Sequence, residues 1–140
     1  MNRMVQLNLI SKEQATMVSC EQIARFFTTE LGRKLQCSKN VLREFKFSVL
    51  DDGSSYAPEM NGEHVLLQGV VDCALVESDG ITVVDFKTDH VTENAIASLT
   101  DRYYGQVMAY VKALERIYGK PVKYAYLYFF RLNQLVLIHP

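Results

Sequence analysis

The sequence predicts one α/β domain in which helices flank a mixed β-sheet of about five strands. Three observations support this fold class. Residues 11–38 and 94–118 have the apolar periodicity of helices, whereas residues 43–49, 65–87 and 122–138 are rich in β-forming or alternating side chains. The order helices, three strands, helix, two strands is typical of a sheet with helices packed on it. The 140 residues, 49% apolar and 22% charged, suit a single globular domain.

Two helix start signals lie near the beginning of the chain. Ser11 is followed three residues later by Gln14, and Ser19 by Gln22, so that each pair has the spacing of a capping box. We therefore expect helices to begin at both serines and residues 1–38 to form a helical amino-terminal part. An apolar stripe at helical spacing follows and is expected to face the core; it comprises Ile23, Phe26, Phe27 and Leu31, with Leu35 beyond Gly32.

Residues 39–140 carry the strands. Between residues 43 and 49 the polarity alternates, with Arg43, Phe45, Phe47 and Val49 on one face and Glu44, Lys46 and Ser48 on the other. Residues 51–62 collect turn formers and predict a loop, and residues 65–76 and 81–87 predict a hairpin around segment 77–80. A helix over 94–118 should end at Gly119, and strands 122–131 and 135–138 should be joined around Asn133.

Composition and charge exclude several classes of protein. The net charge of -1 gives no overall positive field, so any binding of nucleic acid must be local. The three cysteines are odd in number and lack C-x-x-C spacing, which favours reduced thiols over a disulfide framework. No apolar run is long enough to cross a bilayer, and the start lacks a secretory signal. We expect a soluble cytoplasmic protein without membrane contacts.

Three charged residues interrupt the apolar strands of the predicted hairpin: Asp72 in the first strand, and Asp85 and Lys87 in the second. Asp85 and Lys87 are two positions apart and must share a face. A two-residue turn sets Asp72 opposite Lys87, whereas a four-residue loop sets it opposite Asp85. A three-residue loop would send Asp72 to the other face of the sheet.

The chemistry of this set favours hydrolysis of phosphodiesters. Two carboxylates held close together repel each other unless a cation lies between them, and hard oxygen ligands suit Mg²⁺ or Mn²⁺. A lysine beside such an ion orients a water molecule, and the ion stabilises charge that develops on a phosphate oxygen. The alternative is a cross-strand ion pair between an aspartate and Lys87, with the second aspartate spare at the strand end.

The spacing of three motifs resembles a known family. G-x-x-D ends at Asp72, D-x-K spans Asp85 to Lys87, and Q-x-x-x-Y runs from Gln106 to Tyr110. This series resembles the nuclease motifs of the RecB-like branch of the PD-(D/E)xK superfamily. Residues 43–138, about two-thirds of the chain, look like the carboxy-terminal nuclease domain of helicase-nuclease subunits of the AddA (RexA) type. The resemblance implies a restriction-endonuclease-like fold and an exonuclease-type, metal-dependent hydrolysis of DNA by a nuclease core over residues 39–140.

The same resemblance implies roles for the matching residues. Asp72 and Asp85 would bind the divalent metal, Mg²⁺ or Mn²⁺, and the main-chain carbonyl of Phe86 would be a further ligand. Lys87 would serve the attacking water. Asp72, Asp85 and Lys87 would therefore be the catalytic residues.

Three further residues would support the site. The resemblance places Gln106 and Tyr110 beside it, where they help to position DNA or the catalytic groups; they lie one helical turn apart, and Gln106 falls in an apolar stripe, where a polar side chain needs a partner. The alternative is a partly exposed glutamine at the edge of the stripe. Glu44 lies where the family often has an acidic residue, although an exposed glutamate paired with Lys46 or Arg43 is the competing interpretation.

The resemblance also implies partners and a cellular setting. The implied partners are DNA, in single strands fed by a helicase domain of the same full-length chain, and an AddB/RexB-like partner subunit. The implied process is double-strand break repair and recombination, in the bacterial cytoplasm and nucleoid. Relatives carry a metal-binding histidine in a G-T-x-x-H setting, and none precedes Ser11. Either the sequence begins after that helix or this branch of the family dispenses with the histidine, and we favour the first. Asp89 and His90 lie in a loop at the end of the strand, where contacts to phosphate are the alternative, and we expect them to be solvated loop residues.

Two further considerations limit the functional assignment. No P-loop motif is present, so ATP-driven unwinding cannot reside in these 140 residues. The competing hypothesis is a nuclease-like fold with little activity that serves as a DNA-binding or protein-docking module.

Overall fold

The computed structural model describes residues 2–89 and 92–140. The chain divides into two compact units, Met1–Cys37 and Ser38–Pro140. The helices and strands are α1 (Asn2–Gln6), α2 (Lys12–Met17), α3 (Cys20–Phe26), α4 (Glu30–Cys37), β1 (Val41–Asp52), β2 (His64–Val76), β3 (Ile81–Lys87), α5 (Ile96–Tyr118), β4 (Val122–Phe129) and β5 (Gln134–His139). None of the helices within the described ranges is long and apolar enough to span a bilayer.

The helices of the first unit begin where the capping signals predict. The Ser11 hydroxyl accepts a hydrogen bond from the backbone N–H of Gln14 at 3.1 Å, and the Gln14 side chain accepts one from the backbone N–H of Ser11 at 2.8 Å. This is a complete capping box at the start of α2. At the start of α3 the Ser19 hydroxyl accepts from the backbone N–H of Gln22 at 3.2 Å.

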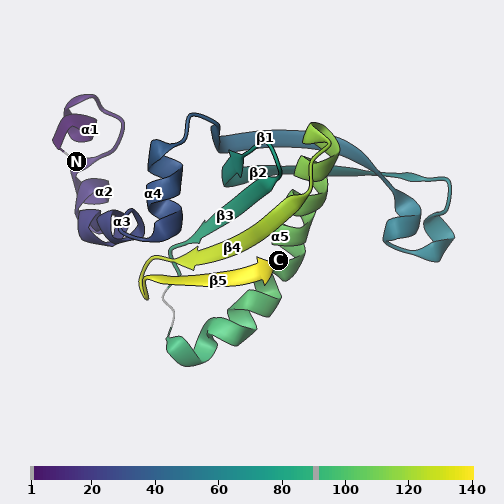
Figure 1. Ribbon diagram of the computed structural model, residues 1–140. Helices are drawn as coiled ribbons and strands as arrows, with labels where there is room; N and C mark the ends of the chain where they lie inside the picture. The colour runs from purple at the N-terminus through teal and green to yellow at the C-terminus, as the bar shows by residue number, and fades with distance from the viewer. Residues whose placement is uncertain (1, 90–91) are drawn as a thin grey trace. The chain divides into compact units, whose positions relative to one another are not determined.

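The apolar stripe after Ser19 differs from the prediction. It is divided between two helices, because the Thr29 hydroxyl accepts a hydrogen bond from the backbone N–H of Gly32 and caps a new helix, α4. Figure 1 shows α4 running at a steep angle to α3. In α3 only Phe26 is buried, whereas Ile23 and Phe27 are exposed. The expectation that the whole stripe faces a core is therefore wrong.

The second unit is built around a five-stranded sheet with the order β1-β2-β3-β4-β5. β3 and β4 are parallel, and the other neighbours are antiparallel. Parallel neighbours need a long crossover, which α5 supplies as it runs along one face of the sheet (Figure 1). This mixed sheet with helices confirms the predicted α/β fold class.

The main core lies between α5 and the sheet. α5 contributes Val107, Tyr110, Val111, Ala113 and Leu114, and the sheet contributes Phe47, Val71, Ala74, Ile81, Val83, Val122, Ala125, Leu127 and Phe129. α5 ends at Gly119, whose φ of 60° is the left-handed conformation that favours glycine at a helix end. Helix and strand ends in this part of the chain follow the prediction within a few residues.

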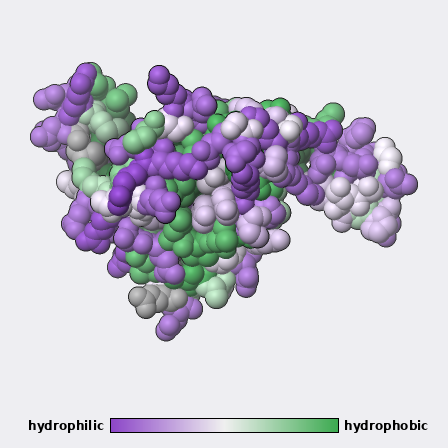
Figure 2. Space-filling model, in the orientation of Figure 1, coloured by the Kyte–Doolittle hydropathy of each residue, from purple (hydrophilic) through white to green (hydrophobic). Residues whose placement is uncertain are grey.

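The outer parts of β1 and β2 form a projecting arm. The two strands pair over residues 41–52 and 64–75, but β3 pairs only with residues 73–76 of β2. The arm therefore extends beyond the sheet (Figure 1), and its surface is mostly hydrophilic (Figure 2).

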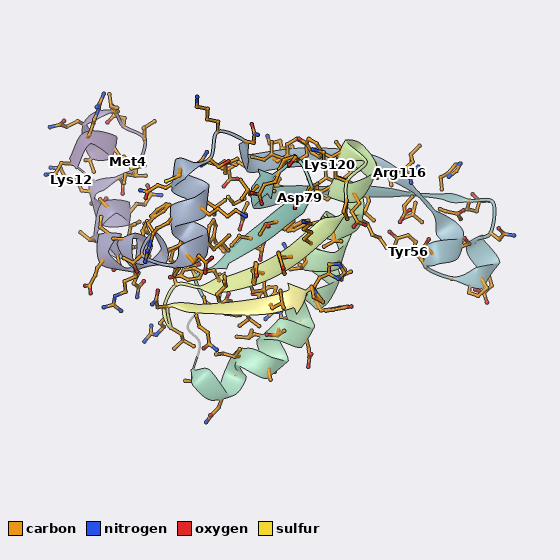
Figure 3. All side chains as sticks on the ribbon, in the orientation of Figure 1. Met4, Lys12, Tyr56, Asp79, Arg116 and Lys120 are labelled. Atoms are coloured by element: carbon orange, nitrogen blue, oxygen red, sulfur yellow. The ribbon has the colours of Figure 1, made fainter. Side chains whose placement is uncertain are left out.

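Asp51, which the sequence places in a loop, belongs to β1 and accepts a hydrogen bond from the Tyr56 hydroxyl at 2.9 Å. Its carboxylate also lies 3.7 Å from Lys112 Nζ and 3.5 Å from Arg116 Nη1 of α5, which ties the arm to the helix. Figure 3 labels Tyr56 and Arg116 on this side of the molecule.

Candidate active site

The register of the β2–β3 hairpin decides where the charged residues meet. Val76 pairs with Ile81, so the connection is a four-residue loop, and the alternative of a two-residue turn is wrong. Continued at the same register, the hairpin sets Asp72 opposite Asp85. The regular pairs end one position earlier, so the two strands part where the carboxylates stand.

At this fork, the point where β2 and β3 separate, the Asp72 side chain replaces a main-chain acceptor of β2. Its Oδ2 accepts a hydrogen bond from the backbone N–H of Phe86 at 2.9 Å. The N–H and C=O of one strand residue point toward the same neighbouring strand, so the carbonyl of Phe86 is directed to the side on which Asp72 lies. The next carbonyl, that of Lys87, accepts from the backbone N–H of Phe130 on the opposite side.

Asp85 is a buried carboxylate, 2% exposed. Burial raises its pKa, the nearby Asp72 carboxylate adds to that increase, and the Lys87 ammonium opposes it. Lys87 Nζ lies 2.7 Å from Asp85 Oδ2, yet this oxygen accepts no well-aligned hydrogen bond from any described residue. Asp85 Oδ2 is therefore a buried acceptor that has an ion-pair partner but no hydrogen bond of good geometry. Two neighbouring carboxylates with such an acceptor are a donor set that fits a hard divalent cation.

Lys87 is held from three sides. Besides Asp85, its ammonium donates a hydrogen bond to Gln106 Oε1 at 3.0 Å and lies 3.7 Å from the centre of the Tyr103 ring. The side chain is only 11% exposed. Its position is therefore determined by one carboxylate of β3 and two side chains of α5.

Gln106 and Tyr110 connect the helix to this cluster. Gln106 Nε2 donates to the Tyr110 hydroxyl at 2.6 Å, so both ends of the amide have partners although the residue is exposed. Tyr110 is buried, and burial together with the charges of Asp85 and Asp72 raises its pKa. Its ring packs edge-on against Phe47, with centroids 5.9 Å apart. The motif residues of α5 thus lie beside the carboxylates.

Glu44 lies across from Asp72 in the register of β1 and β2. Its φ is 50°, a left-handed conformation that glutamate rarely adopts. The kink shifts the alternation of β1, so that Leu42 and Phe45 both pack on the core and Arg43, expected on that face, is exposed. The Glu44 side chain is itself exposed and makes no ion pair with any residue that the structure describes.

Two residues of the cluster were not among the candidates from the sequence. Tyr103 has the helical spacing of a core residue, and its contact with Lys87 is visible only in three dimensions. Asp89, expected to be solvated, accepts from the Tyr103 hydroxyl at 3.1 and 3.2 Å. Tyr103 stands three positions before Gln106 on the same face of α5, and this spacing is the one signal that could have found it. His90 lies outside the described residues.

The cluster has few candidate ligands besides its two aspartates. Within residues 2–89 and 92–140, no three His, Cys, Asp or Glu side chains gather in a group that could hold a metal ion. Asp72 and Asp85 are the carboxylates that the fork of the hairpin brings together.

Comparisons with known proteins agree with this geometry. Residues 4–135 match the family described as the PD-(D/E)XK nuclease superfamily. Proteins named as the A subunit of an ATP-dependent helicase/nuclease are similar to the chain: one from Thermoanaerobacter sp. (strain X514) is 40% identical over 131 residues, and one from Bacillus mycoides (strain KBAB4) is 38% identical over 146 residues. These alignments cover 91% and 97% of this chain but only 11% and 12% of the relatives. The chain belongs to the PD-(D/E)XK nuclease superfamily.

Proposed function

We propose that this chain hydrolyses phosphodiester bonds of DNA with the help of a divalent metal ion. The observation that carries the proposal is the fork of the β2–β3 hairpin, where Asp72 and Asp85 adjoin and Lys87 is held beside them. Both aspartates and the carbonyl of Phe86 would hold Mg²⁺ or Mn²⁺. When bound, such an ion stabilises negative charge on phosphate oxygens and makes a water molecule more acidic.

The side chains of the cluster would divide the remaining work. Lys87, whose ammonium is directed by Gln106, would hold the attacking water or the scissile phosphate in position. Tyr110 would keep Gln106 in its orientation through the hydrogen bond between them. Glu44, level with Asp72 in the register of β1 and β2, would supply a further carboxylate.

The test is cleavage of a labelled single-stranded oligonucleotide in Mg²⁺ or Mn²⁺. Asp72→Asn, Asp85→Asn and Lys87→Met should each lower the rate at least about 100-fold. Asp79→Asn is the matched control, since this exposed carboxylate lies in the loop of the same hairpin and pairs with Lys123. Equal cleavage by the wild type and the three site variants would refute the enzymatic proposal.

The same oligonucleotide distinguishes an enzyme from a binding module. Tight binding of DNA without cleavage, independent of metal and unaffected by Asp72→Asn, would favour a nuclease-like module with little activity. Calorimetric titration of Mn²⁺ should instead show binding that is lost in Asp72→Asn.

The names of the relatives suggest a wider setting. We propose that the chain is the nuclease part of a longer helicase-nuclease that degrades single strands in double-strand break repair and recombination, together with an AddB/RexB-like subunit. The chain spans about an eighth of the relatives it matches, so this setting concerns the longer protein. In that protein, Asp85→Asn should abolish degradation and leave ATP-driven unwinding intact. Loss of both degradation and unwinding would contradict the proposal that this part of the protein carries only the nuclease activity.

A further inference from the structure

The contact between Lys87 and Tyr103 provides a support for the ammonium that is independent of the carboxylates. Lys87 Nζ lies 3.7 Å from the centre of the Tyr103 ring, well within the range of a cation–π interaction. Tyr103 is one helical turn before Gln106, so the ring and the amide oxygen approach the ammonium from the same helix.

A second contact restrains the ring itself. The Tyr103 hydroxyl donates to the Asp89 carboxylate, whose two oxygens lie 3.1 and 3.2 Å away. Asp89 follows β3 by two residues, so the segment that carries Lys87 also carries the group that restrains its aromatic partner. The ring is therefore held between the end of β3 and the face of α5.

We propose that Tyr103 is a positioning residue for Lys87 and acts through the face of its ring. The inference rests on the proposed function in so far as Lys87 acts in hydrolysis. If the two aspartates hold a cation, Asp85 Oδ2 would be shared between that cation and the ammonium, so Lys87 would need supports other than that carboxylate to stay beside the reacting phosphate. Among the residues that the structure describes, the Tyr103 face and the Gln106 oxygen are the supports that remain.

A purely structural role for Tyr103 makes different predictions. The side chain is half-buried and packs against the main core, so removing it would also disturb packing. Tyr103→Phe isolates the contribution of the ring, because it keeps the ring and loses only the hydroxyl that binds Asp89. The Lys87 signal and the Lys87→Met background then separate positioning from packing. Tyr104→Leu is the matched control, since Tyr104 is the next residue of α5 and is 52% exposed.

The first measurement is independent of nuclease activity. In proton NMR spectra of the metal-free chain, the ε-methylene signal of Lys87, identified by its absence in Lys87→Met, should be shifted upfield by the ring current of Tyr103. The shift should disappear in Tyr103→Leu and persist in Tyr103→Phe and Tyr104→Leu. A Lys87 signal at the position of an ordinary exposed lysine in the wild type would overturn the proposal.

The second measurement is oligonucleotide cleavage. Tyr103→Leu should lower kcat about ten-fold with KM changed less than about two-fold, and Tyr103→Phe should recover most of the rate. In the Lys87→Met background Tyr103→Leu should cause no further loss, because a residue that acts through Lys87 has nothing left to position. A full additional loss in that background, or an equal loss in Tyr104→Leu, would overturn the proposal. Absence of cleavage by the wild type would count against the proposed function alone, and the NMR shift would still decide the positioning of Lys87.

Discussion

Replacement of Gly69 by alanine tests how the sheet, the helix and the site are packed together. A Cβ atom at this position would lie 2.9 Å from Cε1 and Cζ of Phe47 and 3.3 Å from Cε1 of Tyr110. Carbon atoms pack best at about 3.5–4.0 Å, so both rings would have to move. Overpacking of this kind costs about 1–3 kcal/mol, whereas alanine loses less conformational entropy than glycine on folding, which offsets up to about 1 kcal/mol of that cost. We expect Gly69→Ala to lower the free energy of unfolding by about 1–2 kcal/mol.

Urea unfolding followed by circular dichroism measures this change. Gly105→Ala is the control, because it is the same substitution at an exposed position inside α5 where an added Cβ meets nothing within 4 Å. It should raise the free energy of unfolding by about 0.5–1 kcal/mol. The two variants should therefore change stability in opposite directions. A Gly69→Ala variant as stable as the wild type would refute the packing argument.

Three further predictions concern other contacts. The Tyr56 hydroxyl holds the pKa of Asp51 below its usual range, so this carboxylate stabilises the fold above about pH 4 and ceases to do so as the pH falls through its lowered pKa. Asp51→Ala should cost about 1 kcal/mol in neutral urea unfolding and nothing in strong acid, and a pH-independent difference would contradict this. Glu115→Ala leaves the buried N–H of Val122 without its 2.9 Å acceptor and should cost about 1–3 kcal/mol, whereas Glu115→Gln should cost less; equal losses would argue against the hydrogen bond. Gln106→Met should lower the cleavage rate about ten-fold with little effect on unfolding, and an unchanged rate would remove the amide from the proposed site.

The elements with strong local signals could be predicted from the sequence. The capping box at Ser11, the end of α5 at Gly119 and the fold class all follow from residue types and spacing. The hairpin of β2 and β3 was also predictable, but its register was not, because segment 77–80 allows either a two-residue or a four-residue turn. That choice decides whether Asp72 faces Asp85 or Lys87.

Other features depend on tertiary contacts that leave no local trace. A glutamate with positive φ cannot be expected from sequence, so the kink at Glu44 and the exposure of Arg43 were missed. Tyr103 has the spacing of an ordinary core residue, and its neighbour Lys87 comes from a different element. The structure also explains why glycine stands at position 69 of the G-x-x-D motif, because the rings of Phe47 and Tyr110 leave no room for a side chain there.

The kink at Glu44 also affects how separate molecules meet. β1 is at the edge of the sheet, and long, flat edge strands invite the strands of other molecules to pair with them. The left-handed Glu44 interrupts this edge, and the charged, exposed side chains of Arg43 and Lys46 lie close to the interruption. The kink beside the carboxylates therefore also breaks the edge at which another strand could pair, and a straight β1 would present twelve continuous residues to such a strand.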